Sequence, residues 1–173
     1  MNIAIRSLLV SAIVISLAAC AGKKEMKPVE NNTMPPQSTA ETKPTMAGDD
    51  FAAADALDRI ACLQNRVVYF DLDATDVRGE FSETLACHAK YLGLHASARL
   101  TLEGHADERG TREYNLGLGE RRGNAVRDML NAAGGASDQS STTSYGEERP
   151  TCQDSNEDCW SKNRRVELVY TAK

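Results

Sequence analysis

The segment from Gly104 to Val126 contains the residues best suited to binding chemistry in this chain. Asp107 lies in a glycine-bounded turn, and Arg122 follows in a segment whose apolar residues have helical spacing. Arg122 falls on the apolar stripe of that helix, four positions from Leu118 and four from Val126. A guanidinium on an inward face cannot lose its charge, so it must contact an anion or stay within reach of water. We therefore expect Asp107 to pair with Arg122 and to give a fixed anion and a fixed cation at the mouth of a pocket.

Four sequence blocks extend this pattern through the second half of the chain. GHADERGT begins at Gly104, YN and LGERR follow in the same helix, and SKNRRVELVY ends at Tyr170. These blocks closely resemble the OmpA-like peptidoglycan-binding domain, and they are most similar to its lipoprotein members from Gram-negative cell envelopes. The resemblance runs from about Val67 to Tyr170 and implies a protein that binds the cell wall.

The resemblance also implies a ligand, the meso-diaminopimelate of the peptidoglycan stem peptide. The free end of this residue carries an ammonium beside a carboxylate, so its recognition needs one fixed anion and one fixed cation. By a residue-by-residue match, Asp107 would contact the ammonium and Arg122 would contact the carboxylate. The other expected binding positions lie in the same loops and helix: Leu72 through its backbone, Asp73, Arg109 and Leu118.

Each charged candidate also has a purely structural interpretation. Asp107 and Arg122 can form an ion pair that only bridges a turn and a helix. Arg109 can pair with carboxylates at the surface, and Asp73 can serve only to form its turn. Arg164 opens the last predicted strand, and we expect it to pair with carboxylates rather than to contact a ligand.

Residues 1–19 are predicted to be a secretory signal peptide. Their apolar run from Leu8 to Leu17 is too short for a membrane-spanning helix. The Leu-Ala-Ala-Cys motif that ends at Cys20 is similar to the bacterial lipobox, in which the cysteine is diacylated and becomes the first mature residue. An ordinary cleavable signal with an incidental cysteine is the alternative. Ala21 follows Cys20, which by resemblance to lipoprotein sorting favours the outer membrane.

Residues 20–50 are predicted to be the lipidated cysteine and a disordered tether. They contain four of the five prolines and lack apolar periodicity, so they cannot bury enough surface to offset the entropy of ordering. Residues 51–173 then form one OmpA-like domain. The formal net charge is −5 and the sequence pI is about 5.3. This charge, without a basic stripe, disfavours nucleic-acid binding.

Four cysteines fall within the predicted domain, in a compartment that should be oxidising. Cys62, Cys87, Cys152 and Cys159 permit three pairings. Cys152 with Cys159 is favoured because both lie in one polar loop, and Cys62 with Cys87 would then join the segment before the first strand to the first long helix. CxxC spacing is absent, so we expect neither a metal nor a redox cofactor.

Apolar periodicity and turn residues predict the order of the elements. Helices are expected over residues 51–63 and 79–95, and from an N-cap at Thr111 to about Gly134. Strands are expected over residues 66–70, 99–103, 139–145 and 165–170. The order β-α-β-α-β-β predicts an α+β sandwich with the helices on one face of a mixed four-stranded sheet, which agrees with the OmpA-like fold.

The first half of the long helix has two further features. Asn115 is expected to brace the preceding loop with its side chain. Gly117, Gly119 and Gly123 are each expected to cost up to about 1 kcal/mol relative to alanine, and Gly123 to add some mobility beside Arg122.

The predicted function is that of an outer-membrane lipoprotein that tethers this membrane to peptidoglycan as part of a Tol system for envelope integrity and cell division. By resemblance, the expected partners are peptidoglycan, TolB and other Tol or OmpA-like proteins. A wall-binding lipoprotein acting outside the Tol system is the alternative. An enzyme is disfavoured, because His105 and Asp107 form only an HxD pair, and no GxSxG, HExxH or Cys/His constellation is present.

Overall fold

The computed structural model describes residues 50–135 and 137–173. The predicted signal peptide, the lipid attachment at Cys20 and nearly all of the predicted tether lie outside the described residues. No helix within the described residues is both long and apolar enough to cross a membrane.

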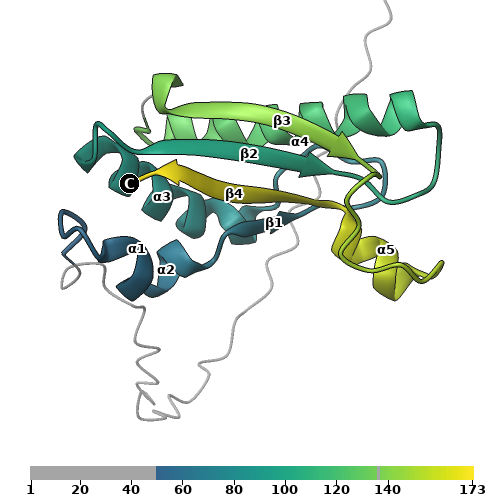
Figure 1. Cartoon of the computed structure of the whole chain (residues 1–173), viewed down its shortest axis with the longest axis horizontal. Coiled ribbons are helices and arrows are strands. Elements are labelled where there is room, and N and C mark those ends of the chain that lie inside the picture. Colours follow the sequence, from purple (N-terminus) through teal and green to yellow (C-terminus); the bar gives the residue numbers. More distant parts are fainter. Residues whose placement is uncertain (1–49, 136) are drawn as a thin grey trace, which may run out of the picture. The chain divides into compact units, whose positions relative to one another are not determined.

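A mixed four-stranded sheet forms the centre of the fold (Figure 1). The strands lie in the order β1-β4-β2-β3. Their bounds are Val67–Tyr69 for β1, Arg99–His105 for β2, Ser140–Gly146 for β3 and Arg165–Ala172 for β4. β4 is antiparallel to both β1 and β2, whereas β2 and β3 are parallel. A parallel pair needs a crossover connection, and the long helix between these two strands supplies it.

Two long helices, α3 (Ser82–Leu94) and α4 (Arg112–Ala132), cover one face of this sheet (Figure 1). A short 3-10 turn, η2 (Gly79–Phe81), leads into α3, and another, η3 (Ser137–Gln139), leads into β3. Alternate residues of β2 and β4 point into the core between sheet and helices, where they meet apolar residues of α3 and α4. The predicted α+β architecture is confirmed.

The segment before β1 differs from its prediction. In place of one helix over residues 51–63, the structure has α1 (Ala56–Arg59) and α2 (Ala61–Gln64). The helix breaks at Ile60, whose backbone is extended (φ −83°, ψ 119°). The break lets the side chains of Leu57, Ile60 and Leu63 all be buried in the core.

The polar segment before β4 also differs from its prediction, because it contains a short helix, α5 (Glu157–Asn163). The side chain of Asn156 caps this helix by accepting a hydrogen bond from the backbone N of Cys159 at 3.0 Å. Acidic Glu157 and Asp158 follow in the first turn, where negative charge is stabilising. The structure joins Cys152 to Cys159, and it joins Cys62 of α2 to Cys87 of α3.

Glycines allow α4 to lie unusually close to the sheet. A Cβ atom at Gly104 of β2 would lie 1.9 Å from the carbonyl oxygen of Gly119, and one at Gly119 would lie 2.3 Å from Oγ of Ser144. A Cβ atom at Gly123 would lie 2.4 Å from Cγ2 of Thr142. This packing of Gly119 and Gly123 was not predicted from the sequence, where only their cost to the helix was expected. The close approach places the first turns of α4 beside the end of β2.

Candidate ligand-binding pocket

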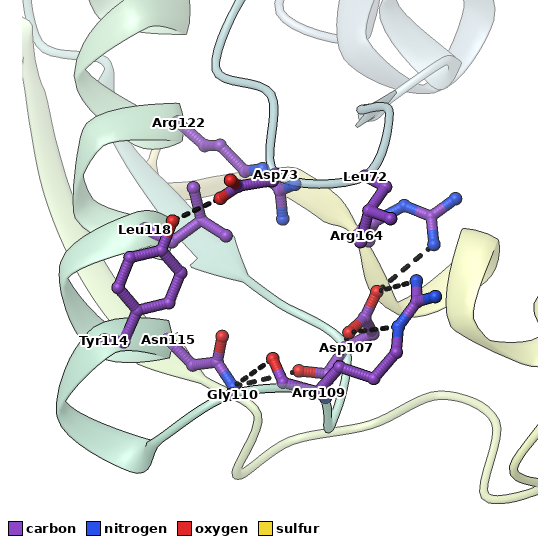
Figure 2. A pocket seen from close by; sticks show the side chains of 10 residues that line it. All are labelled: Leu72, Asp73, Asp107, Arg109, Gly110, Tyr114, Asn115, Leu118, Arg122 and Arg164. Atoms are coloured by element: carbon purple, nitrogen blue, oxygen red, sulfur yellow. Dashed lines mark hydrogen bonds and ion pairs between the residues drawn. The ribbon is translucent and has the colours of Figure 1, made fainter.

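A pocket of about 400 Å³ opens where the loop after β1, the loop after β2 and the first turns of α4 meet (Figure 2). The structure places all six predicted binding residues in its lining: Leu72, Asp73, Asp107, Arg109, Leu118 and Arg122. Four other lining residues were not predicted to contact a ligand: Gly110, Tyr114, Asn115 and Arg164. With Arg164 at the start of β4, four separate segments of the chain therefore build the pocket.

Arg122 is fully buried on the inward face of α4, as its position on the apolar stripe predicts. Its Nε donates to the carbonyl of Ala74 at 2.9 Å, Nη1 to that of His105 at 3.0 Å, and Nη2 to that of Asp71 at 3.0 Å. The predicted ion pair with Asp107 is wrong: none of the ion pairs among the described residues includes Arg122. Carbonyl groups at the ends of strands and loops take the place of the expected anion.

The charge and the remaining donors of Arg122 are both available to a ligand. Burial, assisted by the charge of Arg164, lowers the pKa of Arg122 to about 10, so the guanidinium stays charged at neutral pH. A guanidinium carries five N–H groups, and the contacts with described residues use one on each nitrogen. One N–H on Nη1 and one on Nη2 therefore have no partner among the described residues, and both can donate to a ligand carboxylate.

Asp107 lies at a different edge of the pocket and is 4% exposed (Figure 2). Its Oδ1 accepts hydrogen bonds from the backbone N and Nε of Arg109, at 3.0 and 3.2 Å. Its Oδ2 accepts from Nη2 of Arg109 at 2.7 Å and from Nη1 of Arg164 at 3.2 Å. Burial raises the pKa of Asp107, but the hydrogen bonds from Arg109 and Arg164 outweigh that effect and hold it below its ordinary value. Asp107 is thus ionised, and two arginines already contact its carboxylate.

The predicted pairing of Arg164 with carboxylates is confirmed, and Arg164 also lines the pocket. Besides Asp107, it contacts Glu157 of α5, with 2.6 Å between Nη2 and Oε1. Its Nε donates to the carbonyl of Phe70 at 3.1 Å, which ties the start of β4 to the end of β1.

Asp73 provides a second carboxylate, on the exposed loop after β1. Its φ of 55° is in the left-handed region, which aspartate tolerates better than most residues with a side chain. The hydroxyl of Tyr114 donates to Oδ1 of Asp73 and so links this loop to the first turn of α4. Tyr114 was missed by sequence reasoning, since nothing in the chain before folding indicates that Asp73 lies opposite it.

Asn115 braces the loop after β2, as predicted. Its Nδ2 donates to the carbonyl of Asp107 at 3.1 Å and to that of Arg109 at 3.3 Å. The helix that carries it begins as expected, because the hydroxyl of Thr111 accepts a hydrogen bond from the backbone N of Tyr114 at 3.2 Å. These contacts fix the two charged residues of the loop relative to α4.

His105 does not belong to this pocket, although it precedes Asp107 by only two positions. Its ring packs beside Tyr145, with 5.5 Å between the ring centroids, and burial lowers its pKa to about 4. The HxD pair therefore does not form a catalytic pair with the carboxylate of Asp107. In the part of the chain that the structure describes, no group of three or more histidine, cysteine or acidic residues could hold a metal ion.

The fold and a pocket lined by fixed charges of both signs define a small binding domain. Comparison with known proteins agrees: the model of the OmpA family matches residues 69–164. The chain is 38% identical over 170 residues to a peptidoglycan-associated lipoprotein of Haemophilus influenzae, which covers 98% of this chain and 100% of the relative. It is 37% identical over 157 residues to the protein of that name from Agrobacterium fabrum, covering 91% and 82% of the two chains.

Solved structures lead to the same family. The crystal structure of the peptidoglycan-associated lipoprotein from Burkholderia pseudomallei has a TM-score of 0.64 and 38% identity, and the match covers 70% of this chain and 99% of that one. The C-terminal domain of Helicobacter pylori MotB, at 20% identity and a TM-score of 0.57 over 62% of this chain and 84% of that one, shares the fold. The chain belongs to the OmpA family and, within it, to the peptidoglycan-associated lipoproteins. This is a family of binding proteins and not of enzymes.

Proposed function

We propose that this protein binds peptidoglycan non-covalently through the meso-diaminopimelate of the stem peptide. The observation that carries this proposal is Arg122, a fully buried cation with two unused N–H groups and no ion pair among the described residues. A buried charge of this kind is costly unless an anion reaches it. The two N–H groups suit a carboxylate, and Arg122 lines a pocket that also contains carboxylates of the protein.

The ligand ammonium belongs at Asp107, on a different edge of the pocket from Arg122, whereas Asp73 lies beside Arg122 (Figure 2). Asp107 is ionised, and Asp73 keeps an exposed carboxylate whose hydrogen bond comes from the neutral hydroxyl of Tyr114. The side chain of Leu118 also lines the pocket, where it can contact the methylene groups of the ligand. A stem peptide that lacks the second carboxylate leaves Arg122 unsatisfied, so the pocket favours diaminopimelate over lysine.

We further propose that the protein is held in the outer membrane by lipid on Cys20, with its folded domain in the periplasm. The similarity to the lipoprotein of Haemophilus influenzae extends over 98% of the chain, which supports this arrangement. Several acyl chains anchor a protein stably where one is marginal, and anchoring raises the local concentration of a weak wall-binding site. The protein would thus tether the membrane to the wall within a Tol–Pal system, with TolB as a protein partner.

Cosedimentation with purified peptidoglycan sacculi tests the binding proposal. The protein should pellet with sacculi, and a soluble diaminopimelate-containing muropeptide should release it, whereas the same muropeptide with lysine in that position should release it poorly. Equal competition by the two muropeptides would contradict the role given to Arg122. Failure to pellet would contradict peptidoglycan binding itself.

A further inference from the structure

Helix α5 contacts two charged residues of the pocket, Arg109 and Arg164, but none of its own residues lines the pocket. The guanidinium carbon of Arg109 lies 4.2 Å from the ring centroid of Trp160, in a cation–π contact. The indole Nε1 of Trp160 also donates to Oε1 of Glu108 at 3.0 Å. Trp160 therefore holds two consecutive residues of the loop that carries Asp107.

The contact with Trp160 matters because Arg109 is the more exposed of the two arginines that bind Asp107. The side chain of Arg109 is 33% exposed, whereas that of Arg164 is 7% exposed. Glu157 of α5 lies 2.6 Å from Arg164 but 3.5 Å from Arg109, so it fixes Arg164 more firmly. The ring of Trp160 thus adds a restraint to Arg109, beside its two side-chain hydrogen bonds to Asp107.

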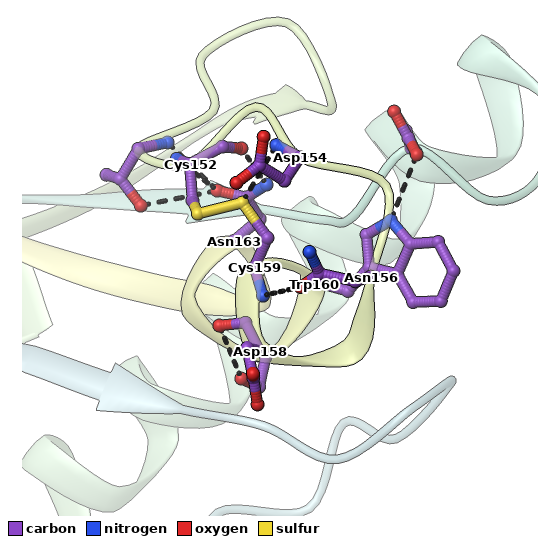
Figure 3. The surroundings of a disulfide bond; sticks show 10 residues. Cys152, Asp154, Asn156, Asp158, Cys159, Trp160 and Asn163 are labelled. Carbon is purple, nitrogen blue, oxygen red and sulfur yellow. Dashed lines mark hydrogen bonds between the residues drawn. A yellow bond between two sulfur atoms is a disulfide. The ribbon is translucent and has the colours of Figure 1, made fainter.

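Two further contacts hold α5 in place (Figure 3). The disulfide to Cys152 fixes Cys159 in the middle of the helix. At its end, Oδ1 of Asn163 accepts hydrogen bonds from the backbone N of Thr151 at 2.9 Å and of Cys152 at 3.1 Å, and its Nδ2 donates to the carbonyl of Cys152 at 2.7 Å. The segment that contains Cys152 is therefore joined to α5 at two separate points.

We propose that Trp160 is a positioning residue for the ligand pocket: it keeps Arg109 on Asp107, and the Cys152–Cys159 disulfide keeps Trp160 in place. This inference rests on the proposed binding of diaminopimelate, because the geometry of Asp107 matters only if that carboxylate receives a ligand. Removal of the ring takes away the cation–π contact of Arg109. The side chain of Arg109 then becomes more mobile, and the carboxylate of Asp107 loses part of its fixed orientation. The pocket weakens although no residue in its lining has changed.

The test compares Trp160→Leu, which removes the aromatic face, with Trp160→Phe, which keeps an aromatic ring for Arg109 but removes the indole N–H. A diaminopimelate-containing muropeptide is titrated calorimetrically into each folded variant. We expect Trp160→Leu to weaken binding about 5- to 20-fold and Trp160→Phe to stay within about 3-fold of the parent protein. The Nε–H signal of Arg109 in ¹H–¹⁵N spectra reports its restraint: it should broaden by exchange with water in Trp160→Leu and be sharp in Trp160→Phe.

The disulfide is tested by the double variant Cys152→Ala/Cys159→Ala, with Cys62→Ala/Cys87→Ala as the matched control. We expect the first pair to weaken muropeptide binding and to broaden the Arg109 signal, and the control pair to change neither while the protein is folded. If Trp160→Leu does not fold, the first disulfide variant decides the question by the same two measurements. Parental affinity together with a sharp Arg109 signal in the deciding variant would overturn the inference. Failure of the parent protein to bind the muropeptide would instead overturn the proposed function.

Discussion

Arg122→Lys should strongly reduce the preference for diaminopimelate while leaving recognition of the ligand ammonium intact. Lysine keeps the positive charge, but it has a single nitrogen with three N–H groups and no planar fork. In the structure, three carbonyl groups already take one hydrogen bond each from Arg122. A lysine ammonium at this position would be occupied by the same carbonyls, so it could not also form two parallel bonds to a ligand carboxylate.

The size of the effect follows from the two N–H groups that Arg122 has left. A hydrogen bond involving a charged group contributes about 1.5–3 kcal/mol, so two such bonds give about 3–6 kcal/mol in total. Part of this remains through the charge of the lysine, and we expect a net loss of about 2–4 kcal/mol, which is about 30- to 1,000-fold in the dissociation constant. Binding of a muropeptide with lysine in the stem should change by less than about 3-fold, because that ligand has no carboxylate for residue 122 to bind.

Isothermal titration with the two muropeptides measures both effects, and Arg121→Lys is the matched control. Arg121 is the neighbouring residue on α4 but is exposed, so its substitution should change neither affinity nor stability by more than about 0.5 kcal/mol. Arg122→Lys should also lower the free energy of unfolding by about 2–4 kcal/mol in urea, since fewer carbonyls keep a donor. A folded Arg122→Lys protein that still prefers diaminopimelate as strongly as the parent would refute the reasoning.

Three other perturbations have equally specific outcomes. Asp107→Asn should weaken binding of both muropeptides by about 2–5 kcal/mol in calorimetry, in contrast to the selective effect expected at Arg122. Weaker binding of only one muropeptide would mean that Asp107 does not face the ammonium. Gly119→Ala should lower the free energy of unfolding in urea by about 1–3 kcal/mol, because its Cβ atom would clash with Ser144 and the backbone of Gly104. Gly117→Ala should raise the free energy of unfolding by up to about 1 kcal/mol, because its Cβ atom would meet only the flexible end of Arg121. Burial lowers the pKa of His88 to about 4, so the unfolded chain binds a proton that the folded protein does not, and stability should fall as pH decreases from about 6.5 to 4. NMR titration of the His88 ring checks this value, and a pKa near 6.5 would contradict the buried neutral histidine.

The fold was readable from the sequence where local periodicity decides the structure. Alternation in β2 and the apolar stripe of α4 gave those elements, and Thr111 marked the helix start within one residue. The break at Ile60 could not be predicted from the sequence, because one continuous helix and two short helices can bury the same apolar residues. Packing against α3 and the sheet selects the two short helices. Helix α5 could have been predicted from the sequence. Asn156 is a favoured N-cap residue, and the acidic residues Glu157 and Asp158 that follow it are typical of a first helical turn.

The pocket was predictable in its membership but not in its contacts. The family resemblance named residues that the structure places in one lining. Yet two of the three partners of Arg122 are backbone carbonyls 48 and 51 positions earlier in the chain, at Ala74 and Asp71. A carbonyl belongs to every residue, so no residue type marks it as a partner. Arg164 reaches Asp107 from 57 positions away, and only the pairing of β4 between β1 and β2 brings it there.

The separation of Asp107 from Arg122 is itself an argument for a binding site. If the two had formed the expected ion pair, a ligand carboxylate would have to displace Asp107 before it could contact Arg122. Instead, carbonyl dipoles hold the guanidinium in a fixed orientation without cancelling its charge, and burial depresses its pKa. A ligand carboxylate would relieve this unfavourable burial. Since the ligand binds only the folded protein, it should stabilise the fold by about 2.7 kcal/mol at a ligand concentration 100 times the dissociation constant. In Arg122→Lys the same concentration of diaminopimelate-containing muropeptide should give a much smaller rise in melting temperature, which calorimetry of the two proteins with and without ligand can measure.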